Sequence, residues 1–486
     1  MRLKTRPQDF RVHELLHDGV VGPAGEHRVY LVHKRKQTSF DAAAELAALA
    51  GVTPADVSMA GLKDRQGITI QHMSVPRGKE INVRSADLKI ETLGYAAEAL
   101  SPEASRGNRF ELVVRELTSR QITRLRASLP AIREFGYPNY FDEQRFGNLR
   151  HRQGWIMLDL LRGDLEGGLR RLLASASPFD PPAARQAKEG IWRCWGDWGA
   201  CRDHAGRFGK HHSVFEHLRR RPDDFAGAFH RIATRERLIH LYAFQSHLWN
   251  LAVESWFEEN LDARARFAVR TRESRLVFPR ASFAFPDAWD GHFPLPGNRL
   301  EEVQDAQQLR HLRAALAKYD LTPDGLFLEG VPGFALKHEL RRIMVVPGDL
   351  KARPLRDGGD DPEHQAVEMR FELPRGAYAT MLVRRLVGPS ATDENANVRT
   401  IRGRVPGGGR PHGQGSWGGG YGGGYGGGRW NRGGEGDGRG FRGDRGRYGS
   451  RPRRGDFGGR GGHGGYGGHG GRGYGDGGYG DGGYGS

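Results

Sequence analysis

The stretch from residue 401 to the C-terminus limits what this chain can fold into more than any other feature. It holds 42 of the 73 glycines and contains no Lys, Leu, Met or Cys. A segment of this composition cannot bury enough apolar surface to offset the conformational entropy that ordering would remove. We therefore expect a disordered Gly/Arg-rich tail over residues 396–486, with the packed domains formed by the residues before it.

The tail and the rest of the chain are both basic. Residues 401–486 contain 14 Arg and 6 acidic side chains, so the tail carries +8 of the net charge of +16. Arg-Gly units interleaved with aromatic residues, as in "GRGFRGDRGRYG", are typical of segments that bind single-stranded RNA by charge and stacking. We expect a nucleic-acid partner, with single-stranded RNA as the ligand of the tail. An inert, solubilising extension is the alternative.

Cysteine content and apolar runs indicate the compartment. Two cysteines, Cys194 and Cys201, are too few for a disulfide scaffold and fit a reducing environment. Their spacing differs from the C-x₂₋₄-C pattern of zinc knuckles, so the sequence predicts no metal site. The N-terminal "MRLKTRPQDF" lacks an apolar segment, and no apolar run of about 18 residues occurs. We expect a cytoplasmic protein without a membrane partner.

Hydrophobic periodicity predicts an α+β fold with a large insertion in its middle. Residues 38–51, "TSFDAAAELAALAG", indicate a helix that ends at Gly51. Residues 56–60 and 68–75 indicate strands joined by the charged loop 61–67. Further strands are predicted over residues 110–114 and 366–373, and further helices over residues 119–136, 231–258 and 376–387.

The loop 61–67, "GLKDRQG", places Asp64 between two cations, Lys63 and Arg65. An aspartate in such a loop is by default a solvated charge that stabilises a turn. The alternative is a carboxylate that neighbouring cations keep ionised, which makes it available as a nucleophile or a base. Local sequence leaves both interpretations open.

Residues 136–147, "GYPNYFDEQRFG", combine aromatic rings with amide and guanidinium groups. A flipped base needs a ring on which to stack and donors for its edge, and Phe141 and Asn139 offer both. Ordinary packing in a core turn is the alternative for any single ring.

Five separate stretches carry a resemblance to a known family. In chain order they are "AGLKDRQGITIQ", "GNRFELVVREL", "PNYFDEQRFG", "AFQSHLWN" and "RFELPRGAYATMLVRRL". They resemble segments of the TruD family, tRNA pseudouridine synthases that act on uridine 13 of the D arm, over roughly residues 4–390. The resemblance implies a catalytic domain with a mixed antiparallel sheet, formed by residues 1–164 and 346–395, and an inserted α+β domain over residues 165–345.

The resemblance also implies site residues. Asp64, in "GLKD", looks like the catalytic aspartate of the family. Phe10, Asn139 and Tyr378 match positions that contact the substrate nucleotide, and Phe141 lies in the same aromatic segment as Asn139. Tyr378 stands where the family has phenylalanine, so the stacking face is kept but the added hydroxyl needs a partner or solvent. Lys4 resembles the basic group that pairs with the aspartate.

Pseudouridine formation breaks the N1–C1′ bond of uridine and joins C5 to C1′. The reaction needs neither redox change nor external energy, so no cofactor or metal is implied. Asp64 could attack C1′, attack C6, or assist departure of uracil, and the sequence does not choose among these routes. Two other functions remain open: a non-catalytic RNA-binding or chaperone protein that uses the fold and the tail, and a synthase with a broader range of RNA substrates.

Overall fold

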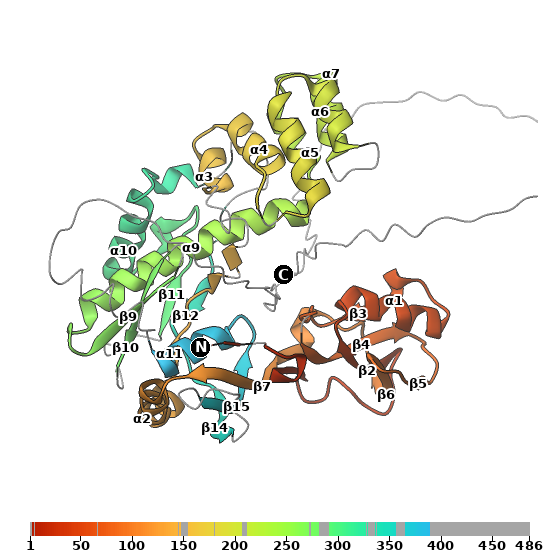
Figure 1. Ribbon diagram of the computed structural model, residues 1–486, viewed down its shortest axis with the longest axis vertical. Coiled ribbons are helices and arrows are strands. Elements are labelled where there is room, and N and C mark those ends of the chain that lie inside the picture. Colours follow the sequence, from red (N-terminus) through yellow and green to blue (C-terminus); the bar gives the residue numbers. More distant parts are fainter. Residues whose placement is uncertain are drawn as a thin grey trace, which may run out of the picture. The chain divides into compact units, whose positions relative to one another are not determined.

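The structure is a computed structural model, and it describes most of the chain before residue 389 (Figure 1). The described residues are 2–3, 5–65, 67–143, 145–146, 154–178, 180–206, 211–271, 274–280, 291–326, 328, 336, 338–355 and 365–388. Within them the chain forms a mixed α+β structure, which confirms the predicted fold class. The tail predicted over residues 396–486 lies outside the described residues.

A nine-stranded sheet unites segments from both ends of the described chain. Its order is β14-β15-β7-β1-β4-β2-β6-β5, with β3 paired to β4. Strand β1 runs parallel to β4, and the other pairs are antiparallel, so the sheet is mixed. The strands are β1 (Phe10–Leu16), β2 (His27–Arg35), β3 (Ser58–Met59), β4 (Ile68–Pro76), β5 (Asn82–Arg84), β6 (Leu88–Ala96), β7 (Ser105–Leu117), β14 (Gly348–Leu355) and β15 (Gln365–Pro374).

Helix α1 (Ser39–Ala50) forms where its terminal residues predict it. The Thr38 hydroxyl accepts a hydrogen bond from the Asp41 amide, and Gly51 ends the helix with a φ of 77°, in the left-handed region that glycine enters without strain. The helix packs on β2 and β4 in a core that includes Leu46 and Met73. The prediction for residues 38–51 is therefore confirmed.

Helices α2 (Ser119–Phe135) and α11 (Ala379–Val387) pack against each other beside β7 and β15. The sequence placed the start of the second helix at Gly376, and this boundary was wrong. Gly376 has a φ of 78°, and its carbonyl accepts a hydrogen bond from Arg341, so the chain is held in a turn and becomes helical only after Tyr378.

The segment between β7 and β14 is mostly helical. The long helix α9 (Thr234–Asn260) confirms the prediction over residues 231–258, and Leu241, Leu248 and Ala252 lie buried on one face of it. Its other helices are α3 (Ile156–Leu161), α4 (Leu165–Ala174), α5 (Pro182–Arg193), α6 (Trp198–Ala205), α7 (His212–Arg220), α8 (Phe225–His230) and α10 (Ala306–Ala317).

Short strands and turns complete the described structure. Strand β8 (Tyr137–Pro138) pairs with β13 (Met344–Val345), β9 (Arg266–Arg270) with β10 (Arg275–Pro279), and β11 (His292–Pro294) with β12 (Leu340–Arg342). The 3-10 turns are η1 (Pro7–Asp9), η2 (Pro54–Asp56), η3 (Pro102–Ala104), η5 (Leu300–Glu302) and η6 (Pro323–Gly325). Within the described ranges, no helix combines the length and apolar composition needed to cross a membrane. The division into domains at residues 164 and 345 stays a prediction.

Candidate active site

The segment that leads into β1 fixes the position of Phe10. Asp9, in η1, accepts two hydrogen bonds from the guanidinium of Arg115 on β7, at 2.9 and 2.8 Å, and another from the Arg6 amide. Bidentate pairing of this kind holds both orientation and distance. Phe10 follows directly, is 7% exposed, and packs edge-on against Phe110 with ring centroids 6.4 Å apart.

Asp64 lies in the loop between β3 and β4 and is 6% exposed. The ammonium of Lys34, on β2, lies beneath this loop. Its Nζ donates hydrogen bonds to the carbonyl oxygens of Gln37, Lys63 and Asp64, at 2.9, 3.0 and 2.8 Å. An ammonium has three donors, so this arrangement uses all of them, and two of the three hold the loop on which Asp64 sits.

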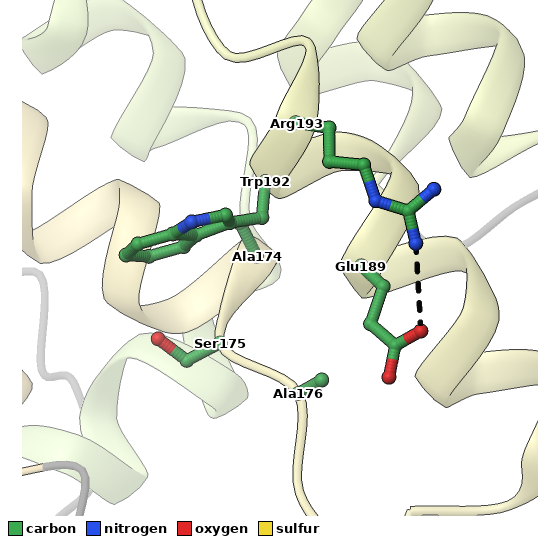
Figure 2. A pocket seen from close by; sticks show the side chains of 6 residues that line it. All are labelled: Ala174, Ser175, Ala176, Glu189, Trp192 and Arg193. Atoms are coloured by element: carbon green, nitrogen blue, oxygen red, sulfur yellow. Dashed lines mark ion pairs between the residues drawn. The ribbon is translucent and has the colours of Figure 1, made fainter.

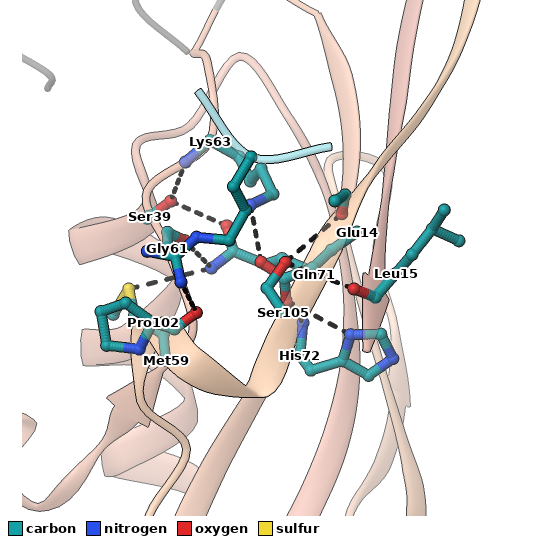
Figure 3. Close-up of polar contacts among 12 residues, drawn as sticks. Glu14, Leu15, Ser39, Met59, Gly61, Lys63, Gln71, His72, Pro102 and Ser105 are labelled. Atoms are coloured by element: carbon teal, nitrogen blue, oxygen red, sulfur yellow. Dashed lines mark hydrogen bonds and ion pairs between the residues drawn. The ribbon is translucent and has the colours of Figure 1, made fainter. Parts of the chain in front are cut away.

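The side chain beside Asp64 is also anchored. The Lys63 ammonium lies 2.6 Å from Glu14 Oε1, and the carboxylate of Glu14 is fully buried. Glu14 Oε2 accepts a hydrogen bond from the His72 amide at 2.9 Å. The Lys63 amide donates to the hydroxyl of Ser39 at 2.9 Å, and that hydroxyl donates to Gln71. Figure 3 shows these contacts converging on the loop from β1, β4 and α1.

Two buried groups around this loop have shifted pKa values. Burial lowers the pKa of Lys34 from 10.5 to about 8, although the charge of Asp64 acts in the opposite direction. Burial alone would raise the pKa of Glu14, but the charge of Lys63 and hydrogen bonds from His72 and Lys63 hold it below its ordinary value. Both groups are therefore charged at pH 7.

Phe10 lies beside the end of the Asp64 loop. A Cβ atom on Gly67 would meet the Phe10 carbonyl oxygen at 2.6 Å and its ring at 2.7 Å, so the two segments touch here without room for a side chain. Parallel pairing of β1 with β4 begins at the next position, where Arg11 is paired with Ile68. The structure thus places Phe10 against the end of the loop that carries Asp64.

A second group of predicted residues surrounds Arg341, the middle residue of β12. Its guanidinium donates to the carbonyl and side-chain oxygens of Asn139, both at 2.9 Å, and to the carbonyl of Gly376 at 2.8 Å. It also lies 3.9 Å from the ring centroid of Phe141. The rings of Phe141 and Tyr378 are 6.3 Å apart and meet edge-on.

The predicted residues around Arg341 are buried and tied to the backbone by hydrogen bonds. Asn139 is 6% exposed, and its Nδ2 donates to the Arg342 carbonyl at 3.1 Å. The Tyr137 hydroxyl donates to the backbone carbonyl of Tyr378 at 3.2 Å. Burial lowers the pKa of Arg341 to about 10, which leaves it charged at neutral pH. Asn139, Phe141 and Tyr378 are therefore neighbours, as the resemblance implied.

Two of the residues that hold the site together were missed by sequence reasoning. Lys34 had a signal, because it follows Tyr30 and Val32 at every second position of a strand and so faces inward with them. The sequence around Arg341 carried no signal that this residue belongs to the site. Lys4, the predicted partner of Asp64, lies outside the described residues.

Comparison with known proteins identifies the family. The model of the family described as tRNA pseudouridine synthase D (TruD) matches residues 1–269 and 290–386. The chain belongs to the TruD family. Membership supports tRNA pseudouridine synthesis, an isomerase reaction on tRNA, as its activity.

Relatives in the TruD family match most of this chain. The tRNA pseudouridine synthase D of Geobacter metallireducens is 31% identical over 412 residues, covering 79% of this chain and 94% of the relative. The tRNA pseudouridine synthase D of Leptospira interrogans is 26% identical over 394 residues, covering 79% of this chain and 95% of the relative. The fold is shared with a crystal structure from Methanosarcina mazei described as a tRNA pseudouridine synthase D (TruD). The TM-score is 0.60 and the sequence identity 20%, and the match covers 79% of this chain and 93% of that chain.

Proposed function

We propose that this protein converts uridine 13 of the tRNA D arm to pseudouridine, with Asp64 as the catalytic carboxylate. The observation that carries the proposal is the anchoring of Asp64. It is buried in the segment "GLKD", on a loop fixed by Lys34 from below and by the Lys63–Glu14 ion pair at the side. In the reaction the N1–C1′ bond breaks, C5 bonds to C1′, the proton on C5 leaves, and N1 takes up a proton, so that the product is an isomer of the substrate.

Electrostatics support a catalytic role for this carboxylate. A desolvated carboxylate stays ionised only where positive charge or hydrogen bonds stabilise it. Lys34 contributes such charge, because it binds the carbonyl of Asp64 itself and its own pKa responds to the Asp64 charge. Lys63 contributes less than its position in the sequence suggests, since its ammonium is directed to Glu14.

The group around Arg341 is proposed to bind the flipped uracil. Arg341 and the Arg342 carbonyl orient the Asn139 amide, and the second Nδ2 hydrogen of that amide can donate to a uracil carbonyl. Tyr378 supplies a stacking ring, and Phe10, beside Asp64, supplies another. Phe141 supports this arrangement from beneath by packing against Arg341 and Tyr378. Stacking and polar contacts offset the few kcal/mol that unstacking a base costs.

The test uses tRNA carrying tritium at uridine C5, because tritium is released only when C5 forms its new bond. We expect release by the wild type and none by Asp64→Asn, with tRNA binding retained. Asp18→Asn removes an exposed carboxylate and is expected to match the wild type. tRNA with cytidine at position 13 should release no tritium. Release by Asp64→Asn would refute the assignment of Asp64, and release from the position-13 variant would refute the site specificity.

A non-catalytic RNA-binding protein is the weaker alternative, because binding alone does not require a buried, anchored carboxylate. A broader range of RNA substrates is favoured by one feature, the basic Arg/Gly tail. Mapping pseudouridine across the transcriptome with and without the gene would show whether sites outside tRNA depend on this protein. The low cysteine content and a tRNA substrate also support the cytoplasm as its location.

A further inference from the structure

Three tryptophans in the helical segment, Trp192, Trp195 and Trp198, differ in burial. Trp198 is 8% exposed, and Trp195 packs edge-on against it at 5.2 Å. Trp195 is half-buried, and its indole N–H donates to Glu166 at 2.8 Å. Trp192, on the last turn of α5, is 48% exposed. The first two have structural roles in packing and hydrogen bonding, and these contacts do not account for the exposed ring of Trp192.

Arg170, on α4, holds the exposed ring in place. Its guanidinium carbon lies 4.1 Å from the ring centroid of Trp192 and 5.9 Å from that of Trp195. A cation over an indole face is an attractive contact, so the ring is oriented before any ligand arrives. A ligand that contacts an oriented ring loses less conformational entropy on binding than one that contacts a freely rotating ring.

The exposed ring borders a cavity of about 370 Å³. Figure 2 shows the indole extending above Ser175, with Arg193 and Glu189 across the opening. Arg193 and Glu189 form an ion pair at 3.8 Å, and Arg170 adds a further positive charge beside the ring. The volume falls in the range of small-molecule sites and is sufficient for a nucleobase.

We propose that Trp192 is a stacking site for an unpaired base of the RNA substrate, outside the uracil-binding group around Arg341. A single exposed apolar side chain is ordinary, but an oriented indole beside a cavity, with two arginines nearby, has the features of a base-stacking platform. RNA is the favoured occupant because the chain carries a net charge of +16 and the guanidinium of Arg170, beside the ring, complements a phosphate. The inference rests on the proposed function, since it assumes that the protein binds tRNA.

Trp192→Leu keeps apolar bulk but removes the aromatic face, and Trp192→Phe keeps a smaller one. We expect Trp192→Leu to raise both KM and Kd for tRNA by roughly 5- to 150-fold, the range measured for loss of one stacked base. The kcat at saturating tRNA should be unchanged, which also shows that the variant is folded. Trp192→Phe should recover part of the loss. Leu93→Ala, which shortens a 46% exposed apolar side chain on β6, is the control and should match the wild type.

Fluorescence gives a second, direct measurement. The chain has 9 tryptophans, so quenching by tRNA is compared between the wild type and Trp192→Phe. A smaller quench in the variant is expected if a base stacks on Trp192. Unchanged Kd and unchanged quenching would overturn the proposal and leave a protein partner as the reason for the exposed ring. Tritium release by the wild type separates that outcome from failure of the proposed function, because the Kd measurement does not depend on catalysis.

Discussion

Lys34 allows a sharp test of how the Asp64 loop is built, through the variant Lys34→Met. The side chain is 2% exposed, and burial lowers its pKa from 10.5 to about 8. At ~1.36 kcal/mol per pKa unit, this difference corresponds to about 3 kcal/mol of folding free energy. Met is of similar length and carries no titrating group, so it removes the pH dependence that the ammonium causes.

The direction of the pH dependence follows from which state, folded or unfolded, holds the Lys34 proton more tightly. The unfolded chain keeps the Lys34 proton up to about pH 10.5, and the folded chain releases it near pH 8. The wild type therefore carries the full desolvation penalty below about pH 8, and the penalty fades as the pH rises to 10.5. The free energy of unfolding of the wild type should rise by about 3 kcal/mol relative to Lys34→Met across that window.

The assay is thermal unfolding from about pH 7 to about pH 10.5, with midpoints of the wild type and the variant compared at each pH. Lys36→Met is the matched control, because Lys36 is exposed and lies two residues away. Its difference from the wild type should not vary in the same window. If the Lys34→Met difference is equally flat, the pKa of Lys34 is not lowered in the folded protein, and the net desolvation of its ammonium is refuted.

Three further predictions concern the site and the tail. Lys63→Met should destabilise the fold by about 3–5 kcal/mol, because it leaves the buried Glu14 carboxylate without its ammonium, and this is measured by denaturant unfolding. Gly67→Ala should lower kcat for tritium release while the protein stays folded, because the new Cβ would displace the Phe10 backbone and ring. Deleting residues 401–486 should weaken RNA binding and its salt dependence, measured by a salt titration, and leave kcat at saturating tRNA unchanged.

Each of these has its own control. The double variant Glu14→Gln with Lys63→Met should be less destabilised than Lys63→Met alone, and equal losses would argue against the ion pair as the cause. A Cβ on Gly22 meets no atom within 4 Å, so Gly22→Ala should leave kcat unchanged. The same affinity with and without the tail at every salt concentration would remove the tail from RNA binding.

Local sequence signals were sufficient to predict the helix and the strand that flank the Asp64 loop. Helix α1 was predictable because Thr38 and Gly51 satisfy its ends with their own atoms. Strand β4 was predictable as a strand from its alternating sequence, although its buried residues in the first half are Thr69 and Gln71 and not the isoleucines. The composition of residues 136–147, which combines rings with polar groups, indicated a segment of interest, and base binding by Asn139 and Phe141 stays a prediction. For α1 the decisive contacts lie within a few residues of the chain.

The remaining site contacts could not be read locally, because they join distant segments. Arg341 binds Asn139 across 202 residues, and the Lys34 ammonium reaches the Asp64 carbonyl across 30. No periodicity in either segment indicates which partner a cation will find after folding. The start of α11 was misplaced for the same reason, because the turn before it is held by Arg341 rather than by its own sequence.

Three cations of the described structure, two of them buried, have hydrogen-bond partners of the same kind. Lys34, Arg341 and Arg385 are held by neutral oxygens: Lys34 binds three backbone carbonyls, Arg341 binds those of Asn139 and Gly376, and Arg385 binds the carbonyl of Arg280. Burial lowers their pKa values to about 8, 10 and 10, so all three stay charged at pH 7. A carboxylate partner would cancel each charge, as Glu14 does for Lys63. Carbonyl partners leave the positive charge without a counter-charge, and this charge favours the binding of a polyanion such as tRNA.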